Sequence, residues 1–239
     1  MDDQVRHRLW KANPEENTAI VASFDTVPEL YIADGHHRSA SAFNVGKMRK
    51  ERAGEGITGE EEFNFFLAIF YPHNQLNVMD YNRVLRTFGG ERTADQFLEE
   101  LKQNFDIIEI TDPKPKAKGQ FSLYINKQWI GLQVKPEKVG EGPIAGLDSQ
   151  ILTDLCFTPL LGITTADLRE QKDIDFVGGL RGIGELEKRC NEDCVAAFAL
   201  YPVGMQEVFD IADAGAIMPP KTTWFEPKPR SGLVVNIFK

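Results

Sequence analysis

The chain has 239 residues, a length that fits one large domain or two small ones. Hydrophobic residues make up 42% and charged residues 26%, as in ordinary globular proteins that bury a core. The net charge of −9 argues against non-specific binding to DNA or RNA, which needs a basic face that releases counterions. We therefore expect no nucleic-acid partner.

Cysteine usage and hydropathy indicate the compartment. Cys156, Cys190 and Cys194 are an odd, sparse set, which favours free thiols in a reducing cytosol over a disulfide framework. One cysteine pair without clustered histidines cannot complete a zinc site. No apolar run approaches the ~20 residues of a membrane span, and the N-terminus does not resemble a secretory signal. We expect a cytoplasmic protein without a membrane partner.

The first third predicts short strands around one helix. Residues 29–33 form an apolar run closed by Asp34-Gly35, which predicts a strand, and helical spacing predicts a helix over 39–51. The run 63–71 is almost continuously apolar and short enough for a buried strand. Another short strand is expected at 76–78, and Arg83 is expected at the surface where a helix begins.

The middle third predicts a capped helix and a hairpin. Thr93 as N-cap and Gln96 as its capping-box partner precede a helix over 94–104, followed by a strand at 106–110. The Pro- and Lys-rich run 112–119 predicts an exposed turn. Strands at 121–125 and 128–134 are expected to form a hairpin, with a helix at 147–157 after them.

The final third alternates strands and helices. Strands are expected at 174–177 and 195–201, helices at 184–189 and 205–214, and a closing strand at 233–238. Gly215 is placed as the C′ residue of the last helix. This irregular order, with at least one hairpin, predicts an α+β fold with a mixed sheet rather than a doubly wound parallel sheet.

Five consecutive residues, Asp34-Gly35-His36-His37-Arg38, place four polar side chains between a predicted strand and a predicted helix. First-turn helix amides lack partners and the helix dipole is positive there, so the position favours anions. Gly35 permits a tight turn close to a ligand. Arg38 offers a planar fork to phosphate, and the histidines can donate to phosphate or transfer protons. Asp34 can hold Mg²⁺ or accept a proton from an attacking hydroxyl.

Other interpretations stay open. Asp34 can be a simple helix cap beside exposed histidines, although capping does not require His-His-Arg, and we favour a functional site. In the loop 218–225, Lys221 and Thr222 can bind phosphate while Trp224 stacks on a base. A rigid surface loop explains those residues equally well. Arg83 is a weaker candidate for a further anion contact.

The segment 31–38, Tyr-Ile-Ala-Asp-Gly-His-His-Arg, resembles the signature of a widespread bacterial and archaeal family catalogued as a domain of unknown function. The resemblance continues, in the family's order, through His7-Arg8-Leu9-Trp10, residues 81–83, Leu147-Asp148 and residues 218–228. The Asp-Gly-His-His-Arg block is also similar to that of the ADP-dependent free-serine kinases, members of the ParB/sulfiredoxin-like superfamily.

The resemblance implies a ParB/sulfiredoxin-like element around the turn. It implies a metal or catalytic role for Asp34, phosphate contacts from His36, His37 and Arg38, and ADP or ATP with Mg²⁺ as cofactors. We expect residues 1–90 to form this region and residues 91–239 to form an α+β region that returns a strand and the 218–225 loop to the site.

The same resemblance implies an acidic general base that the sequence does not locate; Glu15, Glu16 and Glu29 are nearby. Family members carry a substantial segment before the His-Arg-Leu-Trp block, whereas six residues precede it here. We therefore expect this chain to represent the C-terminal portion of the family's fold, with the 1–90 region incomplete at its N-terminal side.

Two functions follow. The first is a nucleotide-dependent phosphotransferase acting on a small hydroxyl substrate such as free serine. Asp34, His36 and His37 would be catalytic; phosphate or nucleotide would be bound by Gly35, His36, His37, Arg38, Lys221, Thr222 and Arg83. The second is a non-catalytic nucleotide sensor. Both predict small-molecule partners, and we expect a homodimer.

Overall fold

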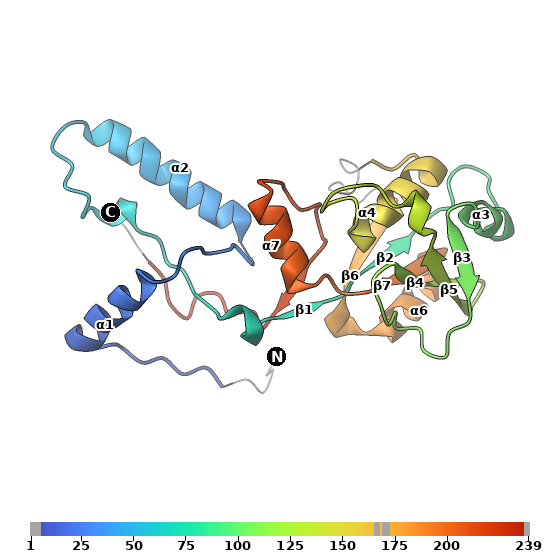
Figure 1. Ribbon diagram of the computed structural model, residues 1–239, viewed down its shortest axis with the longest axis horizontal. Coiled ribbons are helices and arrows are strands. Elements are labelled where there is room, and N and C mark those ends of the chain that lie inside the picture. The colour runs from blue at the N-terminus through green and yellow to red at the C-terminus, as the bar shows by residue number, and fades with distance from the viewer. Residues whose placement is uncertain (1–5, 165–167, 169–172, 237–239) are drawn as a thin grey trace. The chain divides into compact units, whose positions relative to one another are not determined.

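The computed structural model describes residues 6–164, 168 and 173–236 (Figure 1). The chain divides into two compact units, Met1–His36 and His37–Lys239, and each is described by itself. Within the described residues, no helix is both long and apolar enough to cross a membrane.

Among its described residues the first unit contains one complete helix, α1 (Pro14–Phe24), which was not predicted from the sequence. Asn13 caps it: its Oδ1 accepts from the Glu16 amide at 2.8 Å, and Glu16 Oε2 accepts from the Asn13 amide at 2.8 Å. The strand predicted at 29–33 is wrong, because none of these five residues lies in a strand. An apolar run becomes a strand only where another backbone supplies its hydrogen bonds.

The second unit begins with α2 (His36–Ala53, whose first residue belongs to the first unit), which confirms the helix predicted at 39–51 and starts three residues earlier. The buried strand predicted at 63–71 is wrong. Two 3₁₀ turns, η1 (Glu62–Asn64) and η2 (His73–Gln75), flank a run without regular structure. Its phenylalanines are exposed, so continuous apolarity did not here mean burial.

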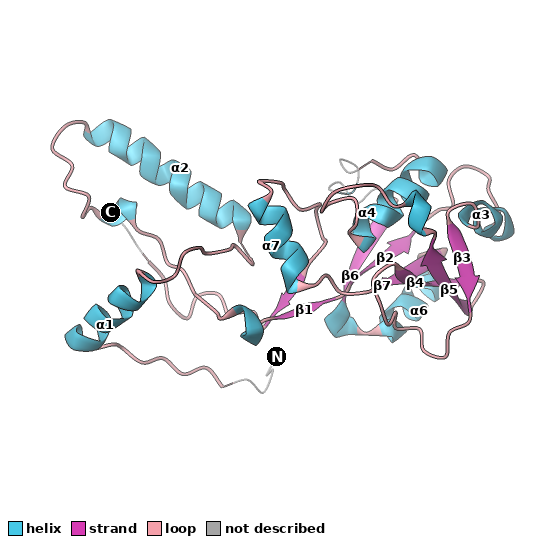
Figure 2. Ribbon diagram, viewed as in Figure 1, coloured by secondary structure: helices cyan, strands magenta, loops and turns pink. Residues whose placement is uncertain are grey.

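A six-stranded sheet forms the centre of the second unit, in the order β3-β5-β4-β7-β2-β6 (Figure 2). Its strands are β2 (Tyr81–Leu85), β3 (Phe105–Ile108), β4 (Gln120–Ile125), β5 (Gln128–Val134), β6 (Ile174–Gly178) and β7 (Ala196–Leu200). A separate two-stranded sheet pairs β1 (Asn77–Met79) with β8 (Trp224–Glu226).

These strands confirm the α+β class, with one correction to the sheet type. Every pairing among the described strands is antiparallel, so the parallel component of a mixed sheet is not found there. The hairpin β4–β5 is confirmed, and its turn residues Asn126 and Lys127 have φ of 50° and 62°, as a type I′ turn requires.

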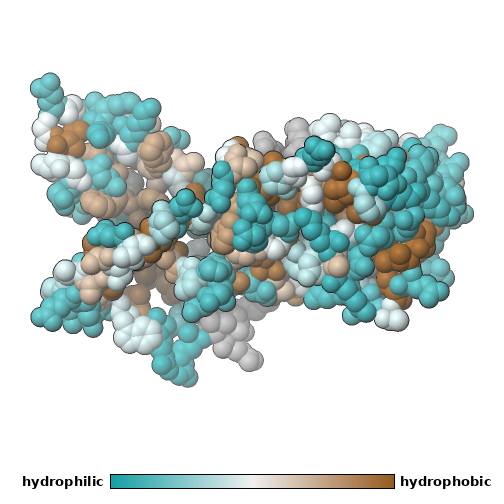
Figure 3. Space-filling view, viewed as in Figure 1, coloured by the Kyte–Doolittle hydropathy of each residue, from teal (hydrophilic) through white to brown (hydrophobic). Residues whose placement is uncertain are grey.

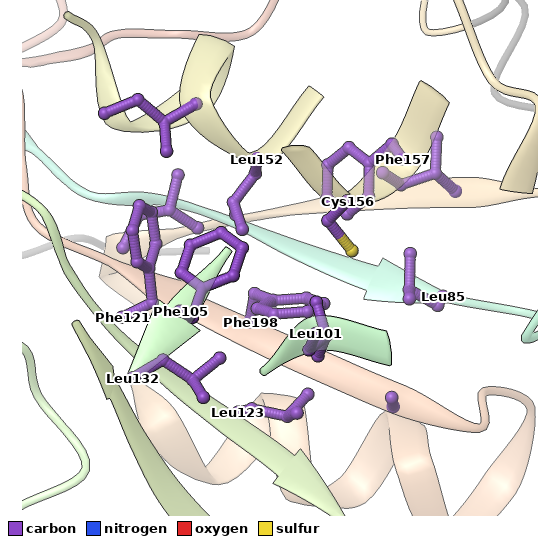
Figure 4. Close-up of a cluster of buried hydrophobic side chains, with 14 of the residues drawn as sticks. Leu85, Leu101, Phe105, Phe121, Leu123, Leu132, Leu152, Cys156, Phe157 and Phe198 are labelled. Carbon is purple, nitrogen blue, oxygen red and sulfur yellow. The ribbon is translucent and has the colours of Figure 1, made fainter. Parts of the chain in front are cut away.

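Helices cover both faces of the sheet, because successive strand residues point to opposite sides. On one face Leu85 and Phe198 pack with Leu152 of α4 (Asp148–Leu152) and Phe157 of η4 (Thr153–Leu161) (Figure 4). Phe97 of α3 (Ala94–Leu101) belongs to the same cluster. On the other face Val84 and Ala197 pack with Leu186 of α6 (Ile183–Glu192). Buried side chains on both faces of the sheet therefore hold β2 in place.

Of the remaining predicted elements, some are confirmed and one is wrong. The capping box of α3 is confirmed, as is α7 (Met205–Asp213) followed by Gly215 at φ 63°. Short 3₁₀ turns lie at η3 (Pro136–Lys138) and η5 (Gly179–Arg181). The strand predicted at 233–238 is absent over 233–236, and 237–238 lie outside the described residues. β8 was missed.

Candidate functional site

The Asp34-to-Arg38 turn has the backbone form of a helix entry. Gly35 has φ of 78°, in the left-handed region that glycine adopts without a Cβ clash, and α2 begins at the next residue. His36, His37 and Arg38 therefore all lie in the first turn of an 18-residue helix, and all three are exposed. Asp34 directly precedes the turn and is also exposed.

The electrostatics of this turn favour an anion. The first-turn amides of α2 have no preceding helical turn whose carbonyl groups could accept hydrogen bonds from them. The first turn also contains no acidic residue. An arginine and two histidines stand there instead. The boundary between the two units falls between His36 and His37, so each side of the turn is described by itself. The assignment of phosphate to these side chains stays a prediction.

The described residues form no preformed metal cage. Over the part of the chain that the structure describes, no three His, Cys, Asp or Glu side chains gather closely enough to hold a metal ion. Mg²⁺ commonly uses one or two protein carboxylates and completes its shell with phosphate oxygens and water, so a cage is not required for it.

Arg83 is not a surface residue at a helix start, which corrects the prediction. It lies in the middle of β2 with 1% of its surface exposed. Its Nη1 donates to the Tyr81 carbonyl oxygen at 2.6 Å, and its Cζ lies 4.6 Å from the centre of the Phe176 ring. Burial lowers the pKa of this guanidinium to about 9. Tertiary packing of the strand overrode the local polarity of the tripeptide.

The 218–225 loop exposes one of its two predicted phosphate-binding residues and buries the other. Lys221, at φ 58°, is exposed, and its Nζ lies 5.9 Å from the centre of the Tyr81 ring. Thr222 is buried: its Oγ1 donates to the Pro219 carbonyl at 2.8 Å and lies 3.1 Å from Ser149 Oγ. Trp224 also packs edge-on against Tyr81, at 5.5 Å between ring centres. The structure thus brings Lys221 and Arg83 to the same tyrosine.

A buried polar network beside that tyrosine was missed by sequence reasoning. Asn82 Nδ2 donates to Asp80 Oδ2 at 2.5 Å, and Asn82 Oδ1 accepts from the Leu200 amide at 2.9 Å. A Cβ at Gly179 would lie 2.3 Å from Asp80 Oδ1, so only glycine fits there. The polar residues Asn82 and Arg83 carried a signal, but the sequence predicted that a helix begins at Arg83, whereas both residues lie in β2.

Asp148 is the second feature that the sequence did not single out for chemistry. It is buried, its Oδ1 accepts from the Gly119 amide at 2.8 Å, and its Oδ2 has no partner among the described residues. Burial raises the pKa of this carboxyl to about 7, and the negative charge of Glu207 acts in the same direction. Glu207 itself is paired with Lys118.

Fold and turn together define an α+β chain with an antiparallel sheet and an exposed helix start that carries two histidines and an arginine. The chain belongs to the family described as protein of unknown function (DUF1015), whose profile matches residues 1–150. No curated protein matches it.

Several solved structures are similar at low identity. A free serine kinase in complex with AMP is 18% identical, with a TM-score of 0.41, over 90% of this chain and 81% of that one. A conserved hypothetical protein from Pyrococcus furiosus is 19% identical, with a TM-score of 0.38, over 81% of this chain and 68% of that one. SbnI with a C-terminal truncation from Staphylococcus aureus is 12% identical, with a TM-score of 0.39, over 95% and 80%.

Proposed function

We propose that this protein transfers a phosphoryl group from ADP or ATP to a small hydroxyl substrate, with free serine as the first candidate. The observation that carries the proposal is the Gly35 turn, after which His36, His37 and Arg38 occupy the first turn of α2. The kinase-like resemblance of the Asp-Gly-His-His-Arg block supplies the reaction class. Phosphoryl transfer depends mainly on positioning and charge stabilisation, which such a turn can provide.

Each residue of the turn has a role in this proposal. The guanidinium of Arg38 takes two phosphate oxygens, and the first-turn amides take others. His36 and His37 donate to the transferred group or move a proton near neutral pH. Asp34 would either accept the proton of the attacking hydroxyl or hold Mg²⁺ with its carboxylate, and bound Mg²⁺ would supply positive charge for the phosphates. A single exposed carboxylate fits that cation when phosphates complete its shell.

The three other residues that were predicted to contact an anion differ in burial, and their proposed roles differ accordingly. Lys221 has an exposed ammonium, so we assign it to an anionic group of a ligand. The Thr222 hydroxyl already bonds Pro219 and lies against Ser149, and Arg83 is buried against Phe176. We assign these two residues to positioning: Thr222 holds the loop, and Arg83 holds Tyr81 beneath Lys221. The division into regions 1–90 and 91–239 is part of the same proposal.

The direct test is O-phosphoserine formation from serine with ADP or ATP and Mg²⁺. We expect Asp34→Ala and Arg38→Ala to lower kcat/KM by at least about tenfold, the size of one lost charged contact. Arg52→Ala is the matched control, because it removes the same side chain from the last turn of α2. Equal loss in Arg38→Ala and Arg52→Ala, or turnover unchanged in Asp34→Ala, would contradict the proposal.

A nucleotide sensor without catalysis is the competing function, favoured by the same exposed turn. Calorimetry with ADP and with ATP, each in the presence of Mg²⁺, separates the two. Binding that weakens in Arg38→Ala but not in Arg52→Ala, together with no phosphoserine, supports the sensor. Binding with turnover supports the kinase, and no binding by either nucleotide rejects both.

A further inference from the structure

Lys221 has a backbone conformation that lysine rarely adopts. Its φ is 58°, in the left-handed region where a Cβ atom causes strain and glycine is preferred. Thr222 holds the chain in this turn, because its Oγ1 donates to the Pro219 carbonyl at 2.8 Å and lies 3.1 Å from Ser149 Oγ. A glycine would take the same conformation without strain. The presence of a lysine is therefore explained by its side chain and not by its backbone.

The ammonium of Lys221 has no carboxylate partner. It is exposed, its Nζ lies 5.9 Å from the centre of the Tyr81 ring, and it forms no ion pair with any of the described residues. Hydrophilic side chains cover much of the surface around the six-stranded sheet in Figure 3, so exposure alone does not distinguish this lysine. The combination of a strained backbone with an uncompensated charge does.

A second cation lies beside the same tyrosine, and it also has no carboxylate partner. The Cζ atom of Arg83 is 5.9 Å from the centre of the Tyr81 ring, the residue is 1% exposed, and its Nε has no hydrogen-bond partner among the described residues. Asp80, the residue before the tyrosine, bonds Asn82 instead. A buried charge without a counterion is costly, and an anion bound nearby offsets part of that cost. The surroundings of Tyr81 therefore favour an anion.

The neighbouring donors are already used, which limits the anion that Lys221 can bind. The hydroxyl proton of Thr222 goes to the Pro219 carbonyl, so Ser149 is the donor in its contact with Thr222. The indole Nε1 of Trp224 donates to a carboxylate oxygen two residues further along the chain, at 2.7 Å. Among these groups, only the ammonium of the lysine is left to contact a ligand.

A single ammonium fits a carboxylate better than the phosphates of a nucleotide. A carboxylate carries one negative charge, whereas a polyphosphate carries several and uses the arginine fork and first-turn amides that the Asp34-to-Arg38 turn supplies. Of the two reactants in the proposed function, the nucleotide brings the phosphates and an acceptor such as serine brings a carboxylate. Tyr81, which packs edge-on against Trp224, gives the ammonium an aromatic neighbour, and a less polar environment strengthens an ion pair.

We propose that Lys221 binds the carboxylate of the acceptor substrate, and that it thereby selects an amino or hydroxy acid over an alcohol without an acid group. Thr222 fixes the position of the lysine, and the buried guanidinium of Arg83 adds positive charge without contacting the ligand. The inference rests on the proposed function for the identity of the acceptor, but binding can be measured without turnover.

Calorimetry with serine and with serinamide, both without nucleotide, tests the assignment. Serinamide keeps the hydroxyl and amino groups of serine and replaces the carboxylate by a neutral amide. We expect Lys221→Met to raise the Kd of serine at least about tenfold, as for one lost charge-assisted hydrogen bond, and to leave the Kd of serinamide unchanged. Lys127→Met is the matched control, because it removes the same charge from another exposed lysine in the left-handed region, at φ 62°.

Each outcome of this titration is decisive. An unchanged Kd of serine in Lys221→Met, an equal loss in Lys127→Met, or no binding of serine to the wild type overturns the assignment. Weaker binding of ADP in Lys221→Met, with serine unaffected, places the lysine at the nucleotide and also overturns it. Serine that binds through Lys221 but yields no phosphoserine rejects the transfer reaction and leaves this binding site standing.

Lys221→Gly separates a role in binding from a role in folding. Glycine relieves the strain of a φ of 58°, so we expect this variant to unfold at a higher urea concentration than the wild type and yet to lose affinity for serine as Lys221→Met does. A lysine kept for its structural contacts would give the opposite result in the urea titration. A lower unfolding midpoint, or wild-type affinity for serine, in Lys221→Gly contradicts the proposal.

Discussion

At the scale of single residues, the positions with the clearest physical consequences are buried polar groups and tightly packed glycines. Asp148 and Gly179 are examples, and the sequence predicted a chemical role for neither. Asp148 is an acid with one oxygen that has no partner among the described residues, and Gly179 faces a carboxylate at a distance that excludes a side chain. Both are therefore testable by single substitutions with controls close by in the chain.

Asp148 should make stability depend on pH. Its pKa is raised from 3.8 to about 7 by burial, so the folded protein holds this proton over a range in which the unfolded chain has lost it. The contribution is complete below pH 4 and is lost as pH rises to 7. Urea unfolding at pH 5 and pH 8 should show a smaller loss of unfolding free energy in Asp148→Asn than in the wild type.

Asp154→Asn serves as the control, because Asp154 is exposed and bonds only the nearby Gln150 side chain at 2.8 Å among the described contacts. An identical pH dependence in the wild type and Asp148→Asn would show that Asp148 is ionised in the folded protein throughout this range.

Gly179→Ala should be costly and Gly184→Ala should not. The added methyl at Gly179 meets Asp80 Oδ1 at 2.3 Å, and overpacking of this kind costs about 1–3 kcal/mol. At Gly184, inside α6, nothing lies within 4 Å, and alanine favours a helix by up to about 1 kcal/mol. Unfolding free energies from denaturant titration decide this, and equal effects of the two substitutions would contradict the packing argument.

At the scale of elements, the β4–β5 hairpin is closed by two non-glycine residues in the left-handed region. Lys127, at φ 62°, occupies the turn position where glycine is preferred. Lys127→Gly should therefore raise the unfolding free energy by about 0.5–1 kcal/mol. Lys114→Gly, in an exposed turn, is the comparison, and a destabilised Lys127→Gly variant would mean that the lysine side chain contributes more than its backbone costs.

Elements with local signals were the ones that the sequence predicted well. The Thr93–Gln96 capping box, the Asn126-Lys127 turn and Gly215 after α7 each depend on residues close together in the chain. The failures at 29–33 and 63–71 have a common cause, since a strand needs a partner backbone that no local pattern reveals. Helix α1 was predictable, because Asn13 and Glu16 are a capping pair. It was missed because the segment contains only a short apolar stretch.

The candidate site likewise has a part that the sequence predicted and a part that it did not. The turn at Gly35 and the start of α2 follow from adjacent residues, and the sequence located both to within a few positions. The positions of Arg83 and Thr222 depend on contacts with Phe176 and Ser149, which lie 93 and 73 residues away in the sequence. Burial of those two side chains was therefore invisible before the sheet and its flanking loop were assembled.

At the scale of the whole molecule, the strand order has a consequence for synthesis on the ribosome. β2 lies between β6 and β7, so that Arg83 faces Phe176 on one side and Phe198 on the other. Both neighbours are translated long after β2 has left the exit tunnel. The nascent chain must therefore carry an unpaired central strand while the 88 residues between Leu85 and Ile174 are added, and contacts this distant in sequence are slow to form. Until β6 and β7 have been translated, the exposed edges of β2 should make the nascent chain prone to aggregation and a target for chaperones.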